Sequence, residues 1–185
     1  MYISQQLRKQ NIAEYLLYMW QVEDILRAFD VNLTRIRKEY VPRFEYDEQQ
    51  IEDLTDWFGN LINMMNSEGK REKGHLAINE AVMKQLIDLH LALSNSTKFP
   101  FYTAQYYKVL PFIVELRTKN GNGDSTENEI ETCFNALYGA MMLRLQGRTM
   151  SPETKHAIDE IATFIGMLSD YYKQDRDEGL IFEEE

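Results

Sequence analysis

The sequence predicts an all-α fold, arranged as a single-domain, up-and-down-like bundle of six long helices and one short helix. Apolar residues recur at spacings of three and four along almost the whole chain, and no segment shows the two-residue alternation of a half-buried strand. Nine Gly and four Pro among 185 residues leave few places to turn, which favours long helices. A chain of this length buries about 70% of its unfolded surface, enough for one core.

The first helix is expected from Ser4 to Phe29. Apolar residues cover more than one of its faces, so we expect it to be central and mostly enclosed. A short helix from Val31 to Tyr40 should follow, with Asp30 as its N-cap. Pro42 then ends this helix, because the residue before a proline is disfavoured in the helical conformation.

The third and fourth helices are predicted to form an antiparallel hairpin. Asp47 and Gln50 have the spacing of a capping box, and the helix that they open should stop near Gly69. The polar segment from Ser67 to Gly74 is typical of a loop. Apolar residues at helical spacing from Leu76 to Leu93 indicate the fourth helix.

The fifth helix is expected from Phe99 to Lys119, with Pro111 in its middle. A proline inside a helix removes one backbone donor and collides with the preceding turn, which predicts a kink or a break near Leu110.

The last two helices each carry a start signal. Thr126 and Glu129 form a second possible capping box for the sixth helix, and Ser151 with Pro152 supplies the N-cap and first position of the seventh. We therefore divide the chain into a helical bundle domain, residues 1–174, and an acidic tail, residues 175–185.

Composition narrows the classes of function. One cysteine, Cys133, gives no intramolecular disulfide and no zinc motif, which favours the cytoplasm. No signal peptide is expected at the N-terminus, and the longest nearly uncharged run, Tyr15 to Val22, is too short to span a bilayer. A net charge of −10 disfavours binding to nucleic acid.

Two stretches carry a family resemblance. Residues 11–24, Asn-Ile-Ala-Glu-Tyr-Leu-Leu-Tyr-Met-Trp-Gln-Val-Glu-Asp, resemble the opening of an uncharacterised bacterial family of all-helical proteins of similar length, a domain of unknown function. Residues 128–131 and 136–139 are similar to a second stretch of that family. The resemblance implies the helical fold, and it implies no activity, ligand or catalytic residue.

Two histidines follow a glutamate by three residues, the spacing found in di-iron carboxylate bundles. These candidate metal ligands are Glu72, His75, Glu153 and His156. The alternative is structural, because Glu72 lies in the Gly-flanked loop and Glu153 in a first helical turn, where a carboxylate favours the helix dipole. We expect the alternative to hold, and we predict no cofactor.

Other candidates concern a small-ligand pocket. Aromatic side chains around Pro111 could line a site for a flat ligand, although an aromatic core is the commoner outcome; they are Tyr102, Tyr106, Tyr107 and Phe112. Glu14 and Arg144 lie in strongly apolar stretches, as do Glu23 and Asp24, so that a buried ion pair or an anion pocket is possible. His90, on the apolar face of the fourth helix, is expected to be a packed ring.

The tail places Leu180, Ile181 and Phe182 between acidic flanks. It could dock on its own bundle, on a second copy or on a partner, or remain a disordered end. Nine Met and 22 aromatic residues, together with this tail, favour a non-enzymatic protein that acts through self-association or protein–protein interaction, possibly as a homodimer. A ligand- or metal-binding bundle is the alternative, and no catalytic motif is visible.

Overall fold

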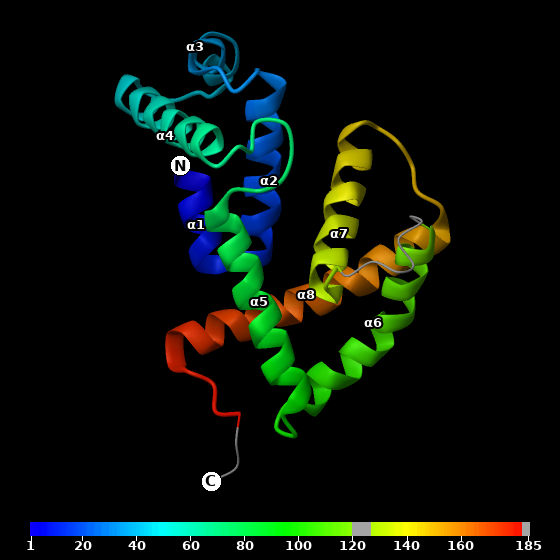
Figure 1. Ribbon diagram of the computed structural model, residues 1–185. Helices are drawn as coiled ribbons and strands as arrows, with labels where there is room; N and C mark the ends of the chain where they lie inside the picture. Colours follow the sequence, from blue (N-terminus) through cyan, green and yellow to red (C-terminus); the bar gives the residue numbers. More distant parts are fainter. Residues whose placement is uncertain (120–126, 183–185) are drawn as a thin grey trace. The chain divides into compact units, whose positions relative to one another are not determined.

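The computed structural model describes residues 1–119 and 127–182, and every regular element in these ranges is a helix (Figure 1). The prediction of an all-α, single-domain fold is confirmed. In order, the elements are α1 (Tyr2–Gln10), α2 (Ile12–Ala28), α3 (Leu33–Arg35), a π-helical turn (Ile36–Tyr40), a 3-10 turn (Val41–Arg43), α4 (Glu48–Ser67), α5 (Ala77–Asn95), α6 (Pro100–Lys119), α7 (Glu129–Leu145) and α8 (Pro152–Glu178).

The chain groups into two compact units within this fold. The first unit is Met1–Lys9 with Glu14–Val82, and the second is Gln10–Ala13 with Met83–Glu185. In the second unit α8 packs against both α6 and α7, and these two helices also pack against each other. None of the helices in the described ranges combines the length and apolar character needed to cross a bilayer.

The predicted first helix, Ser4 to Phe29, is wrong in one respect, because the chain is interrupted at Asn11. The Asn11 side chain accepts a hydrogen bond from the Ala13 backbone N–H at 3.1 Å, as an N-cap does. A short polar side chain of this kind competes with the helical backbone and starts a new helix. The expected enclosure of the segment is confirmed for α2, where Leu16 and Leu26 are fully buried.

The short helix after α2 also differs from the prediction. Asp30 and Val31 have φ values of 57° and 54°, so neither begins a helix, and Asn32 is the N-cap in place of Asp30. Val31 is buried, and its N–H donates to the Leu26 carbonyl at 2.8 Å. This burial and hydrogen bond offset a left-handed conformation that β-branched residues rarely adopt.

The start signals read from the sequence are largely confirmed. Asp47 forms its capping box with Gln50, and the Ser151 hydroxyl accepts from the Thr154 backbone N–H. Thr126 lies outside the described residues. The capping box of α7 is formed two residues later than predicted, by Asn128 and Glu131.

Of the two predicted outcomes at Pro111, the break near Leu110 is wrong, because α6 continues through Pro111. The kink stays a prediction. Pro111 leaves the carbonyl of Tyr107, four residues earlier, without its helical donor. Both residues lie on the exposed side of α6, where water can hydrogen-bond that carbonyl. The helix therefore tolerates the proline without ending.

Candidate functional site

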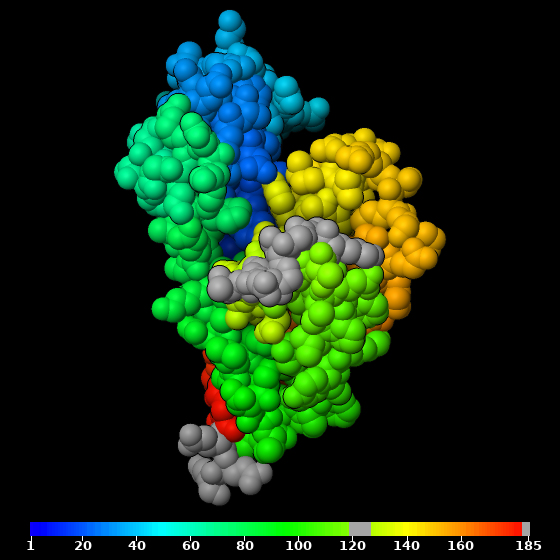
Figure 2. Space-filling model, turned by 45° about the vertical axis from the view of Figure 1, so that its right-hand side comes forward, coloured from blue at the N-terminus to red at the C-terminus, as the bar shows by residue number. Residues whose placement is uncertain are grey.

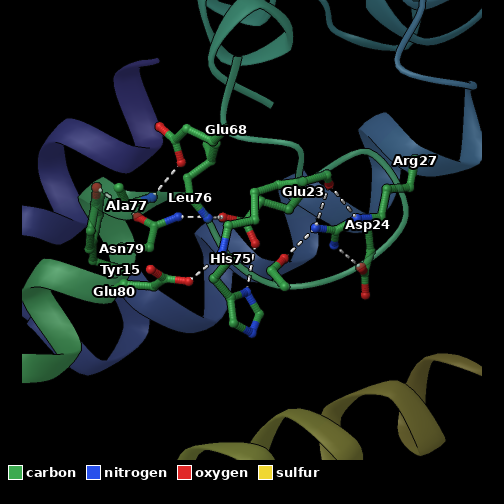
Figure 3. A network of polar contacts seen from close by, with 12 residues as sticks. Tyr15, Glu23, Asp24, Arg27, Glu68, His75, Leu76, Ala77, Asn79 and Glu80 are labelled. Atoms are coloured by element: carbon green, nitrogen blue, oxygen red, sulfur yellow. Dashed lines mark hydrogen bonds and ion pairs between the residues drawn. The ribbon is translucent and has the colours of Figure 1, made fainter. Parts of the chain in front are cut away.

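A polar network joins α2 to the loop between α4 and α5 (Figure 3). Glu23 and Asp24 each lie three or four residues from both Trp20 and Arg27, so the four side chains share one face of α2. Each of the four contacts either the loop or another member of this face. We treat this set, which links α2 to the loop and to the start of α5, as the candidate functional site.

Glu23 is the centre of the network. Its side chain is fully buried, and its Oε1 accepts from the Leu76 backbone N–H at 2.9 Å and from the Asn79 amide at 2.7 Å. Its Oε2 lies 2.7 Å from Nδ1 of His75. Asn79 is also buried, and its oxygen accepts from the Tyr15 hydroxyl at 3.4 Å. Three donors thus replace the water that a buried carboxylate loses.

The same contacts explain how α5 begins. The first N–H groups of a helix have no partner within the helix, and Leu76 has no side-chain oxygen with which to cap them. Glu23 from α2 accepts from the Leu76 N–H, and Glu68 accepts from the Ala77 N–H at 2.7 Å. Negative charge here also favours the helix dipole. Two carboxylates distant in sequence therefore replace a local cap.

His75 is held in one orientation. Its ring stacks on the indole of Trp20, with the ring centroids 4.1 Å apart and the planes 12° apart. Because Nδ1 faces the Glu23 carboxylate, the proton of the neutral imidazole belongs on Nδ1 and Nε2 is the acceptor. In Figure 3, one ring nitrogen of His75 points toward the Glu23 carboxylate, and the rest of the ring lies on the side facing away from it.

Arg27 fixes the loop through backbone carbonyls. Its guanidinium donates to the Lys70 carbonyl at 3.1 Å from Nη2, contacts the Gly74 carbonyl, and pairs with Asp24 at 2.9 Å. Arg71, from the loop itself, donates to the Asp30 carbonyl at 2.9 Å. Arg27 and Arg71 therefore hold the loop against α2 and the residues that follow it, through hydrogen bonds to backbone carbonyls.

A second cluster surrounds His90 in the other unit. His90 is buried, its Nδ1 lies 2.7 Å from the Tyr102 hydroxyl, and the rings of Tyr106 and Phe164 pack edge-on against it. Burial lowers the pKa of His90 to about 4, so its ring is neutral at pH 7 and shares a hydrogen bond with the Tyr102 hydroxyl through Nδ1. The prediction that His90 is a packed ring is confirmed.

The buried imidazole predicts a pH dependence of stability. In the unfolded chain His90 takes up a proton near pH 6.5, whereas in the fold its pKa is about 4, so acid between these values favours unfolding. Compared with His90→Gln, the wild-type chain should lose roughly 3 kcal/mol of stability between pH 7 and pH 4. Urea unfolding of both proteins across this range measures the difference. A difference that is constant with pH would contradict the prediction.

The four aromatic side chains predicted to line a ligand site have different surroundings in the structure. Tyr102 and Tyr106 pack around His90, and Tyr107 is exposed. Phe112 instead lines a separate cavity of about 320 Å³, with Glu153 and His156 from the first turns of α8. Its ring meets that of His156 edge-on, with the centroids 5.5 Å apart.

The candidate metal ligands do not lie together, as a shared metal site would require. His75 pairs with Glu23 instead of Glu72, which is exposed. Glu153 and His156 are also exposed. Within residues 1–119 and 127–182, no three or more His, Cys, Asp or Glu side chains group in a way that could hold a metal ion.

The sequence indicated that the Glu23 carboxylate needs a polar partner, but it did not indicate which residue that partner is. The suggested buried ion pair of Arg144 with Glu14 or Glu23 is wrong, because the side chains of Arg144 and Glu14 are exposed. A glutamate inside an apolar stretch was the signal that marked Glu23. Nothing local identified His75, which lies 52 residues further along the chain.

The tail docks on its own unit. The Ser96 hydroxyl donates to the Phe182 carbonyl at 2.8 Å, Leu180 is half-buried, and Ile181 is exposed. Of the alternatives left open by the sequence, the structure shows docking on the same chain.

Comparison with known proteins adds the family. No curated protein and no solved structure matches this chain. A family model described as a domain of unknown function, DUF4924, matches residues 1–179, which include the whole Glu23 network and the His90 cluster. The resemblance to an uncharacterised family is thereby confirmed, and the chain belongs to the DUF4924 family.

Proposed function

We propose that this protein is non-enzymatic and acts by associating with a second copy of itself through the outer face of α6. The observation that carries the proposal is the exposure of large apolar side chains in register along this helix: Phe101 is 81% exposed, Tyr107 65% and Val114 54%. Ala104 and Pro111 are exposed between them. At 100° per residue all five lie on one face. Figure 2 shows part of α6 at the surface, in light green.

An exposed apolar face of this kind favours burial against a partner. Residues 101–114 extend over about 20 Å of helix. Soluble monomers rarely expose contiguous apolar patches of more than a few hundred Å². Covering these side chains would remove apolar surface from water at about 25 cal/mol per Å².

A second copy is the partner that this face fits best. In a two-fold dimer the same patch meets itself, and an antiparallel pairing centred between Tyr107 and Lys108 places Phe101 opposite Val114 of the other copy. Lys108 and Glu115 give the face one charge of each sign, although the whole chain has a net charge of −10. Repulsion between copies is therefore weak here.

Sedimentation velocity over a range of protein concentrations tests the proposal. We expect the wild-type chain to form dimers as its concentration rises, and the double variant Phe101→Ser, Val114→Ser to remain monomeric. Leu91→Ser is the matched control, because Leu91 is an apolar residue of α5 that is 50% exposed and lies off this face. A monomeric wild-type chain at every concentration, or equal disruption by Leu91→Ser, would contradict the proposal.

The second candidate function is the binding of a small ligand. The cavity lined by Phe112, Glu153 and His156, at about 320 Å³, lies within the size range of ligand sites. Native mass spectrometry of the purified protein tests it. A stoichiometric additional mass that His156→Ala removes would support ligand binding, whereas the bare chain mass would count against it.

A further inference from the structure

The chain after α8 turns back onto the second unit. Gly179 has a φ of 78°, a conformation that glycine adopts without strain, and it ends α8. The Leu180 backbone N–H then donates to the Asp175 carboxylate at 2.9 Å. Two residues later the Phe182 carbonyl accepts from the Ser96 hydroxyl at 2.8 Å. Residues 180–182, which we call the tail segment, are thus held by hydrogen bonds at both ends.

The Phe182 side chain joins the aromatic core of this unit. Its ring centroid lies 5.5 Å from that of Phe99, which meets Tyr171 edge-on at 5.3 Å. Tyr171 in turn packs against Tyr102. Between two residues that are half-buried, Ile181 is 69% exposed. The tail segment therefore contacts the unit through Leu180 and through the aromatic ring of Phe182, whereas Ile181 between them faces solvent.

A groove that the tail segment does not fill lies beside the Phe182 side chain. A cavity of about 410 Å³ has Phe182 as one wall. Its other lining residues come from α5 and the end of α8, namely Gln85, Asp88, Leu89, Ala92, Tyr172, Asp175 and Arg176. An aromatic anchor in a pocket beside partly polar walls is the usual design of a peptide-binding site.

The groove residues of α5 and α8 lie within the family match, whereas the tail segment lies just beyond it. The family match covers residues 1–179, so all the groove residues from α5 and α8 lie inside it. The tail segment begins at residue 180, immediately beyond the match.

From these observations we propose that the site formed by Ser96 and Phe99, beside the groove that Phe182 also lines, is a peptide-binding site for an aromatic tail segment, and that the tail of a second copy occupies this site when the chain's own tail leaves it. The occupant's chemistry is that of the seated tail: an aromatic ring against Phe99 and a backbone carbonyl for the Ser96 hydroxyl. This surface is separate from the outer face of α6, and the inference does not depend on the proposed dimer.

The tethered tail is a strong competitor for its own site. A segment joined to its site by a short linker has an effective concentration in the millimolar range. At micromolar protein the wild-type site is therefore closed to a second tail. A chain whose own tail cannot seat should accept an added tail at least about tenfold more tightly.

Fluorescence anisotropy with a labelled peptide of residues 177–185 tests the inference on full-length protein. We expect the peptide to bind the Phe182→Ala chain at least about tenfold more tightly than the wild-type chain. Ile181→Ala is the matched control, because its tail keeps the anchor and should bind peptide as weakly as wild type does. Circular dichroism checks that each variant is folded.

Two further measurements assign the contacts. A peptide carrying Phe182→Ala should not bind the Phe182→Ala chain, and adding Ser96→Ala to that chain should weaken binding of the unmodified peptide. Equal affinity for wild-type and Phe182→Ala chains, or no binding to either at about 1 mM peptide, would overturn the inference. The Phe101→Ser, Val114→Ser variant should bind peptide as wild type does, which separates this result from dimerisation through α6.

Discussion

Replacing Glu23 by alanine is expected to lower the free energy of unfolding of the first unit by about 3 kcal/mol. The substitution deprives the Leu76 N–H, the Asn79 amide and His75 Nδ1 of their acceptor. Buried donors without a partner carry a desolvation cost of about 1 to 3 kcal/mol each. The start of α5 also loses a negative charge that favours its dipole.

Urea unfolding and hydrogen exchange together measure this effect. The Leu76 amide should exchange faster in Glu23→Ala, because its hydrogen bond to the carboxylate is lost. Asp24→Ala, at the next residue of α2, is the control: its pair with Arg27 is partly exposed and should contribute less than about 1 kcal/mol. Similar losses of stability for the two variants would show that the buried network is not what stabilises the loop.

Tyr102→Ala is expected to cost about 4 kcal/mol in the second unit. Tyr102 is fully buried, and its ring packs against Phe164 and Tyr171. Removing it leaves a cavity and deprives Nδ1 of His90 of the hydroxyl that lies 2.7 Å away. The expected cost therefore combines lost packing with a lost buried hydrogen bond.

Phe101→Ala is the matched comparison, because it removes an aromatic ring from the adjacent residue of α6. Phe101 is 81% exposed, so its replacement should change stability by no more than about 0.5 kcal/mol. Denaturant midpoints at a low, fixed protein concentration compare the variants without a contribution from association. Equal effects of the two substitutions would contradict the assignment of inner and outer faces of α6.

Much of the helical architecture could be predicted because its signals are local. The capping box of Asp47 with Gln50 and the N-cap Ser151 depend on atoms a few residues apart, so spacing in the sequence specifies them. The errors occurred where the choice between two local structures was close. Asn11 could be a helical residue or a cap, and Pro111 could break a helix or lie on its solvated side.

The candidate site was predictable only in part. A charged residue within an apolar stretch indicated that Glu23 needed partners, and the position of His90 on an apolar face indicated a packed ring. The metal pairing of His75 with Glu72 was suggested by spacing, but the structure gives His75 a closer carboxylate from another helix. Spacing along one helix cannot reveal competition from a side chain on a different one.

The sequence by itself determined the all-α class, most helix ends and the residues that must be buried, because periodicity and capping operate over one or two turns. Only the tertiary structure decided that Glu23 from α2 caps α5, since its donors lie more than 50 residues away and are brought to it by packing. The seat of Phe182 was decided in the same way, because Ser96 is 86 residues distant and no local pattern encodes that contact.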